Sequence, residues 1–83
     1  MSEPPEDPIA TAERHVGIGE ALVARQLAVI DELDRDNHLE AAARGRKLLV
    51  ALQRSLDLAR EHLRVERDRQ RAGAKLPGAA SES

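Results

Sequence analysis

Two stretches of this chain repeat apolar or small residues at alternating intervals of three and four. In the first stretch, the repeating positions are Ile9, Ala12, Val16, Gly19, Val23, Gln26, Ile30 and Leu33. In the second stretch, they are Ala42, Gly45, Leu49, Leu52, Leu56, Ala59 and Leu63. This heptad spacing places each series in one stripe along an α-helix, where the stripe can pack against a neighbouring helix. The pattern therefore predicts an all-α chain with two long amphipathic helices.

The residues that flank the stripes predict where each helix begins and ends. Asp7 followed by Pro8 is typical of an N-cap and first helical residue, so we expect a first helix from about 8 to 35. The turn is expected near residues 37 and 38. Asn37 either closes the first helix in a left-handed conformation or caps the second helix together with Glu40. The second helix is expected from about 39 to 71.

The two ends of the chain lack the large apolar side chains that a folded core needs. Residues 1–7 are rich in proline and acidic groups, and residues 73–83 are mostly small or polar. Such composition is typical of disordered segments, because little apolar area is available to offset the entropy of ordering. We therefore expect one helical-hairpin domain over 8–72 between two disordered tails.

A short turn between two long helices makes them antiparallel neighbours, so residues equally far from the turn should meet. In five of the seven pairs that this rule sets across the stripes, a small residue faces a large one. Gly19 falls opposite Leu56 and Gly45 opposite Ile30, which gives each helical glycine a packing role that offsets its cost of about 1 kcal/mol relative to alanine. Gly17 has no such partner. The predicted fold is a coiled-coil-like antiparallel two-helix hairpin.

The composition excludes several classes of function. The chain has no Phe, Tyr, Trp or Cys. Without cysteine there is no disulfide framework, thiolate metal site or cysteine nucleophile, and without aromatic rings there is no stacking platform for single-stranded nucleic acid. No apolar run approaches the roughly 18 residues that span a membrane, and the N-terminus does not resemble a signal peptide. The sequence therefore favours a cytoplasmic protein without a membrane segment.

Charge is divided unevenly between the two halves of the chain. Residues 1–40 carry ten acidic and three basic residues, whereas residues 41–83 carry ten basic and five acidic residues. An acidic first helix beside a basic second helix would produce this division, and one edge of the hairpin should bring Glu13 close to Arg60.

Several apolar side chains lie outside the two stripes. They are Ile18, Leu22, Leu27, Val29, Leu48, Leu58 and Val65. We expect Leu22, Val29 and Leu48 to form a second apolar face along one edge, since a two-helix unit of this size needs additional burial. The simplest partner is a second copy, which would give a homodimer in the form of a four-helix bundle. Another protein that docks a helix on this face is the alternative.

The best candidate for nucleic-acid binding is the basic end of the second helix. Basic side chains there could contact successive phosphates of a nucleic acid; they are Arg60, Arg64, Arg67 and Arg71. The alternative function is therefore that of a small nucleic-acid-binding or regulatory protein. However, acidic residues stand three positions before Arg64, Arg69 and Arg71, which is the spacing of ion pairs within one helix. A solvated helix end is the favoured interpretation, and nucleic acid is an unfavoured partner.

Candidates for catalysis and for metal or cofactor binding are few. His15 and His62 should lie on the same edge, where two imidazoles could share a metal ion or respond to pH, but no carboxylate is placed to complete a site. Ser55 is the one serine inside a predicted helix, and no base is expected near it. We therefore predict no enzyme activity, no catalytic or metal-binding residues and no cofactor.

Residues 13–64 resemble a family of short uncharacterised bacterial proteins. The shared features are the opening Glu13-Arg-His-Val-x-x-Gly-Glu20, an Ala-Arg-Gln26 segment followed by aliphatic residues, a turn ending in His38, and a leucine-rich second helix that ends near His62. The chain differs in having Asn37 where glycine is usual, and in lacking a Thr or Asp cap after the turn. The resemblance implies a helical hairpin in a bacterial cytoplasm and no known activity. We accordingly expect a noncatalytic hairpin that acts by self-association or by binding another protein.

Overall fold

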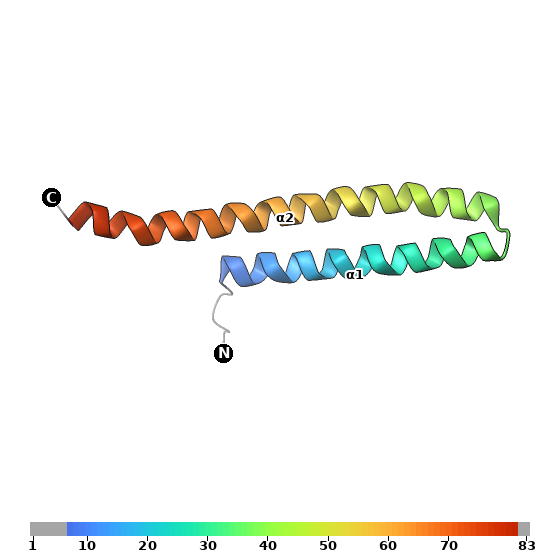
Figure 1. The fold of residues 1–83 in the computed structure, drawn as a ribbon, viewed down its shortest axis with the longest axis horizontal. Coiled ribbons are helices and arrows are strands. Elements are labelled where there is room, and N and C mark those ends of the chain that lie inside the picture. The colour runs from blue at the N-terminus through green and yellow to red at the C-terminus, as the bar shows by residue number, and fades with distance from the viewer. Residues whose placement is uncertain (1–6, 82–83) are drawn as a thin grey trace, which may run out of the picture.

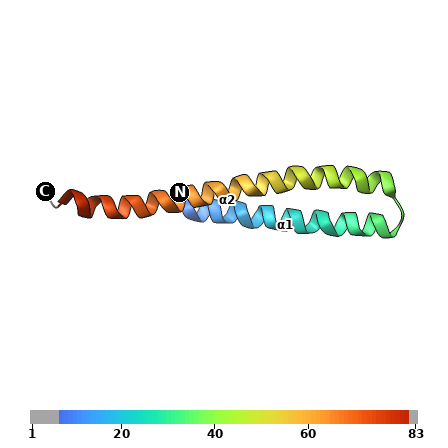
Figure 2. The same ribbon diagram turned by 45° about the horizontal axis from the view of Figure 1, so that its top comes forward.

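The structure is a computed structural model that describes the backbone of residues 7–81 and the side chains of residues 7–73. It contains two helices, α1 (Pro8–Arg35) and α2 (Leu39–Ser81), which form an antiparallel hairpin. Figures 1 and 2 show α1 lying beside α2 from the turn to its own N-terminus, beyond which α2 continues alone. The predicted all-α hairpin is therefore confirmed.

The turn between the helices is closed by Asn37. This residue has a positive φ of 61°, in the left-handed region that asparagine tolerates better than most side chains. The Asn37 N–H donates to the Asp34 carbonyl at 3.1 Å, and the His38 N–H donates to the Leu33 carbonyl at 2.9 Å. These two bonds make a Schellman motif, which satisfies carbonyls that the end of α1 would otherwise leave unpaired. Of the two roles predicted for Asn37, the structure shows the closing of α1.

The first helix, α1, begins at the position that the sequence predicted. Asp7 is the N-cap and Pro8 lies in the first turn, but the Asp7 side chain makes no capping hydrogen bond. Its backbone carbonyl accepts from the Thr11 N–H at 2.9 Å, which is the first bond of the helix. The predicted disordered segment 1–7 otherwise lies outside the described residues. Asp7 therefore begins the helix through its backbone.

The end of α2 differs from the predicted boundary. The helix runs to Ser81, whereas the sequence predicted an end near 71 and a disordered tail over 73–83; residues 82 and 83 lie outside the described part. The prediction rested on the absence of apolar groups for tertiary packing. Extending an existing helix adds one backbone hydrogen bond for each residue that it fixes, except at Pro77, which has no N–H to donate, so extension does not strictly require a packing partner.

The two heptad stripes form the seam between the helices. Every position of both series is buried or half-buried, and Figure 1 shows the two helices side by side along this seam. A Cβ placed on Gly19 would lie 3.0 Å from Leu56 Cδ1, and a Cβ placed on Gly45 would lie 3.0 Å from Ile30 Cγ1. Small residues therefore face large ones in the predicted register, and the absent side chains let the helices approach closely.

One polar residue takes part in the seam. The side-chain amide of Gln26 donates to the carbonyl of Gly45 at 2.9 Å. This bond crosses from α1 to α2 and is available only where a residue without a side chain exposes its backbone. It pairs the one polar member of the α1 stripe and adds a directional contact to an interface of aliphatic groups.

The core of the hairpin is small. Among the residues whose side chains the structure describes, the buried apolar residues are Ala12, Ile30, Ala42, Leu56 and Leu63. Two of these five are alanines, and none of the larger side chains is completely removed from solvent. A hairpin of two helices covers only one stripe of each, so it leaves other apolar side chains in contact with water.

Candidate functional site

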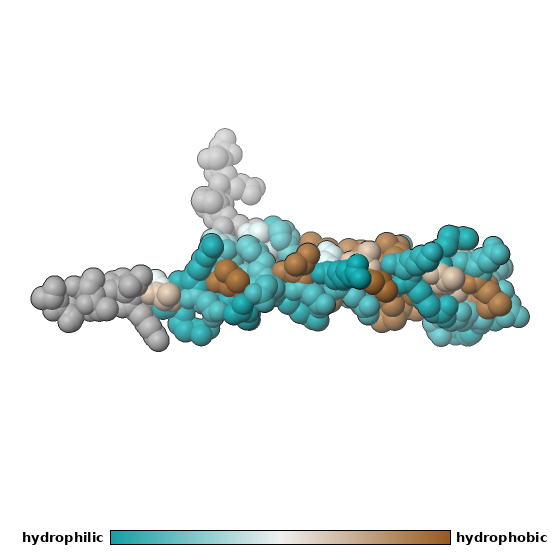
Figure 3. All heavy atoms as spheres, turned by 90° about the horizontal axis from the view of Figure 1, so that it is seen from above, coloured by the Kyte–Doolittle hydropathy of each residue, from teal (hydrophilic) through white to brown (hydrophobic). Residues whose placement is uncertain are grey.

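The two long edges of the hairpin carry different side chains. One edge, called here the apolar edge, is defined by five exposed aliphatic residues, Ile18, Leu22, Val29, Leu48 and Leu58. Three of them are the predicted docking residues. Leu22, Val29 and Leu48 are exposed by 44%, 39% and 50%, although each is a large aliphatic side chain. Figure 3, in which the hairpin is seen from above, shows apolar patches reaching the surface among hydrophilic residues.

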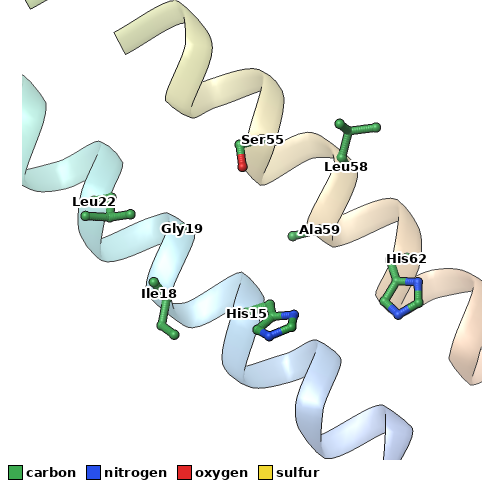
Figure 4. A pocket seen from close by; sticks show the side chains of 8 residues that line it. All are labelled: His15, Ile18, Gly19, Leu22, Ser55, Leu58, Ala59 and His62. Carbon is green, nitrogen blue, oxygen red and sulfur yellow. The ribbon is translucent and has the colours of Figure 1, made fainter. Parts of the chain in front are cut away.

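A shallow groove runs along the apolar edge where α1 and α2 meet. Its volume is about 410 Å³, and it is lined by His15, Ile18, Gly19, Leu22, Ser55, Leu58, Ala59 and His62. Figure 4 shows Ile18 and Leu22 on α1 and Leu58 on α2 bordering the groove, with Gly19 and Ala59 between the two helices. The small residues of the seam form the floor because they have little side chain to fill it. Val29 and Leu48 continue the same edge toward the turn, at heptad spacing from Leu22 and Ser55.

Ile18 and Leu58 extend the apolar edge beyond the three residues that the sequence predicted for it. Ile18 is 51% exposed and Leu58 is 71% exposed. Both line the groove, whereas Leu27 stands seven residues from Glu20 and Asp34, whose ion pairs lie on the opposite edge. The heptad position distinguishes them in the sequence: Ile18 and Leu58 stand three residues after His15 and Ser55 respectively, so they share the side of the helix that those residues occupy.

The opposite edge, called here the charged edge, joins acidic residues of α1 to basic residues of α2. Its interhelical ion pairs are Glu13 with Arg67 at 3.1 Å, Glu20 with Arg60 at 3.3 Å, and Asp34 with Arg46. Both members of each pair recur at multiples of seven residues along their helices. The division of charge between the two halves of the chain is therefore explained in part by contacts within the hairpin.

One predicted contact on this edge is wrong. Glu13 was expected near Arg60, but Glu13 pairs with Arg67, and Arg60 pairs with Glu20. Side chains on a helix lean toward its N-terminus, so those of α1 lean away from the turn and those of α2 lean toward it. Glu13 therefore meets the α2 residue one heptad farther from the turn than the residue that was predicted.

All four arginines proposed for nucleic-acid contact have acidic neighbours. Arg60 and Arg67 take part in the charged edge, Arg64 pairs with Glu61 and Asp68, and Arg71 lies 3.6 Å from Asp68. The predicted spacing of intrahelical pairs is confirmed at Glu61–Arg64, Glu66–Arg69 and Asp68–Arg71. This arrangement places carboxylates beside each guanidinium, which does not favour a phosphate-binding surface.

The contact between Glu61 and Arg64 shifts the titration of both groups. The hydrogen bond from Arg64 and its positive charge lower the pKa of Glu61 below its usual value. The same hydrogen bond and the charges of Glu61 and Asp68 raise the pKa of Arg64. Both side chains are more than half exposed to solvent, so this pair stabilises the helix only weakly.

The two histidines lie on the same edge of the hairpin, as predicted, and at one end of the groove (Figure 4). His15 and His62 extend from facing turns of α1 and α2 in Figure 4. His62 Nε2 also lies 3.8 Å from a carboxylate oxygen of Glu66, one turn farther along α2. Among the residues that the structure describes, no group of three or more His, Cys, Asp or Glu side chains is arranged to hold a metal ion.

Glu66 is a residue whose place the sequence analysis did not identify. Its side chain is only 15% exposed, which is low for a carboxylate in a two-helix hairpin. It stands three residues after Leu63, so the heptad stripe of α2 continues through it and places it opposite Ile9 at the open end of the seam. Extending the stripe by one position would have found it.

Two further findings concern a possible membrane segment and similarity to known proteins. Within the part of the chain that the structure describes, neither helix has an apolar segment long enough to cross a membrane. Comparison of the sequence and the structure with protein-family models, with curated proteins and with solved structures gave no match.

Proposed function

We propose that this chain is a noncatalytic helical hairpin that acts by self-association, with two copies joining through their apolar edges to form a four-helix bundle. The observation that carries the proposal is the series of exposed aliphatic side chains on one edge, from Ile18 to Val29 on α1 and from Leu48 to Leu58 on α2. A cluster of exposed apolar side chains of this kind marks a place where another molecule can remove them from water.

A second copy fits the apolar edge better than a different partner does. In a two-fold symmetric dimer, the same surface of each molecule meets itself, so the surface must be self-complementary. An aliphatic edge satisfies this condition because apolar side chains pack against one another without regard to sign of charge. The charged edge already pairs its acids and bases within one chain, so it has little to gain from a second molecule.

The small core of the hairpin gives a thermodynamic reason for dimerisation. Complete burial of one Leu, Ile or Val side chain contributes about 1.5–3 kcal/mol, and an isolated hairpin leaves five of them partly exposed on one edge. Small helical units commonly reach stability through oligomerisation. Dimerisation would convert each two-helix layer into half of a bundle with a shared core.

Two matched substitutions test this proposal by sedimentation equilibrium. Leu48 on the apolar edge and Leu27 on the charged edge are both 50% exposed, so Leu48→Glu and Leu27→Glu make the same chemical change at the same exposure. We expect the wild-type protein and Leu27→Glu to sediment as dimers, and Leu48→Glu to sediment as a monomer over the same range of concentration. Circular dichroism of each variant monitors whether its helices are retained.

Three results would contradict the proposal. The first is a wild-type protein that remains monomeric and stably helical at every concentration. The second is a dimer that dissociates equally in both variants. The third is a thermal midpoint that is independent of protein concentration, since a dimer of coupled folding and association must become more stable as its concentration rises.

A further inference from the structure

We draw no further inference here: the strongest candidate, the exposed stripe of small residues along the outer side of α1 formed by Gly17, Ala21, Ala24 and Ala28, carries nothing because no feature of the structure shows what covers it.

Discussion

The two edges of the hairpin are built on the same geometry and have opposite chemistry. Each edge presents side chains from both helices at heptad intervals beside the seam. On the charged edge, acids of α1 meet bases of α2 within one chain. On the apolar edge, the side chains border a groove and remain exposed. The chain therefore pairs the charged side chains of one edge by itself and leaves the aliphatic side chains of the other edge exposed.

The energetics of the two edges differ as much as their composition. An ion pair between exposed side chains contributes about 0.2–1 kcal/mol and is weakened by salt, so the charged edge mainly selects how the two helices align. Burial of an aliphatic side chain contributes more and does not depend on a particular partner atom. The charged edge therefore contributes little to the stability of the hairpin, and the apolar edge would contribute more only where a second molecule covers it.

The largest expected effect on stability comes from disturbing the seam that holds both edges in register. Gly45→Leu would overpack the interface, because even a Cβ at this position lies 3.0 Å from Ile30 and 3.2 Å from Gln26. We expect the free energy of unfolding to fall by about 1–3 kcal/mol. Gly17→Leu is the matched control, since a Cβ there meets nothing within 4 Å. It should gain about 0.8 kcal/mol from helix propensity. Thermal and urea unfolding that show equal effects for the two variants would refute the register.

A smaller effect should come from the charged edge. We expect a double-mutant cycle on Glu20 and Arg60, with each residue changed to Ala, to give a coupling energy of about 0.2–1 kcal/mol, because both side chains are more than half exposed. Added salt should reduce this coupling while leaving the proposed dimer of the apolar edge intact. A coupling that is unaffected by salt would show that the two edges do not differ in the way described.

A third prediction fills the gap in the charged edge. Leu27 and Gln53 occupy the heptad positions between the pairs of Glu20 with Arg60 and of Asp34 with Arg46. Leu27→Glu combined with Gln53→Arg should be more stable than Leu27→Glu alone by about 0.2–1 kcal/mol in low salt, measured by chemical denaturation. If the order of stability is reversed, the heptad assignment of this edge is wrong.

The smallest effect is expected away from both edges, at Glu61. Its pKa is lowered by Arg64, so the pair contributes stability above the ordinary pKa of a glutamate and loses it as the pH falls through the lowered value. Glu61→Gln should therefore lose slightly less stability on acidification than the wild-type protein does, as measured by thermal unfolding at neutral and acidic pH. Because the side chain of Glu61 is more than half exposed, a large difference would show that this pair is not a surface contact.

Much of the fold could be predicted because it depends on local spacing. The heptad stripes predicted both helices and their pairing. The predicted contacts of Gly19 with Leu56 and of Gly45 with Ile30 were confirmed. The docking residues Leu22, Val29 and Leu48 were placed on one edge for the same reason. The partner of Glu13 was not predicted correctly, since pairing by distance from the turn ignores the direction in which side chains lean.

The sequence by itself determined the two helices, the position of the turn, the register of the seam and the side of each helix that carries aliphatic residues. Periodicity is a local property, so it can be read without knowledge of the neighbouring helix. Only the tertiary structure decided which acids meet which bases, how far α2 continues beyond α1, and that Ile18 and Leu58 border one groove. Those features depend on the direction of side chains across the helix interface and on space left between them, which spacing along a single chain does not contain.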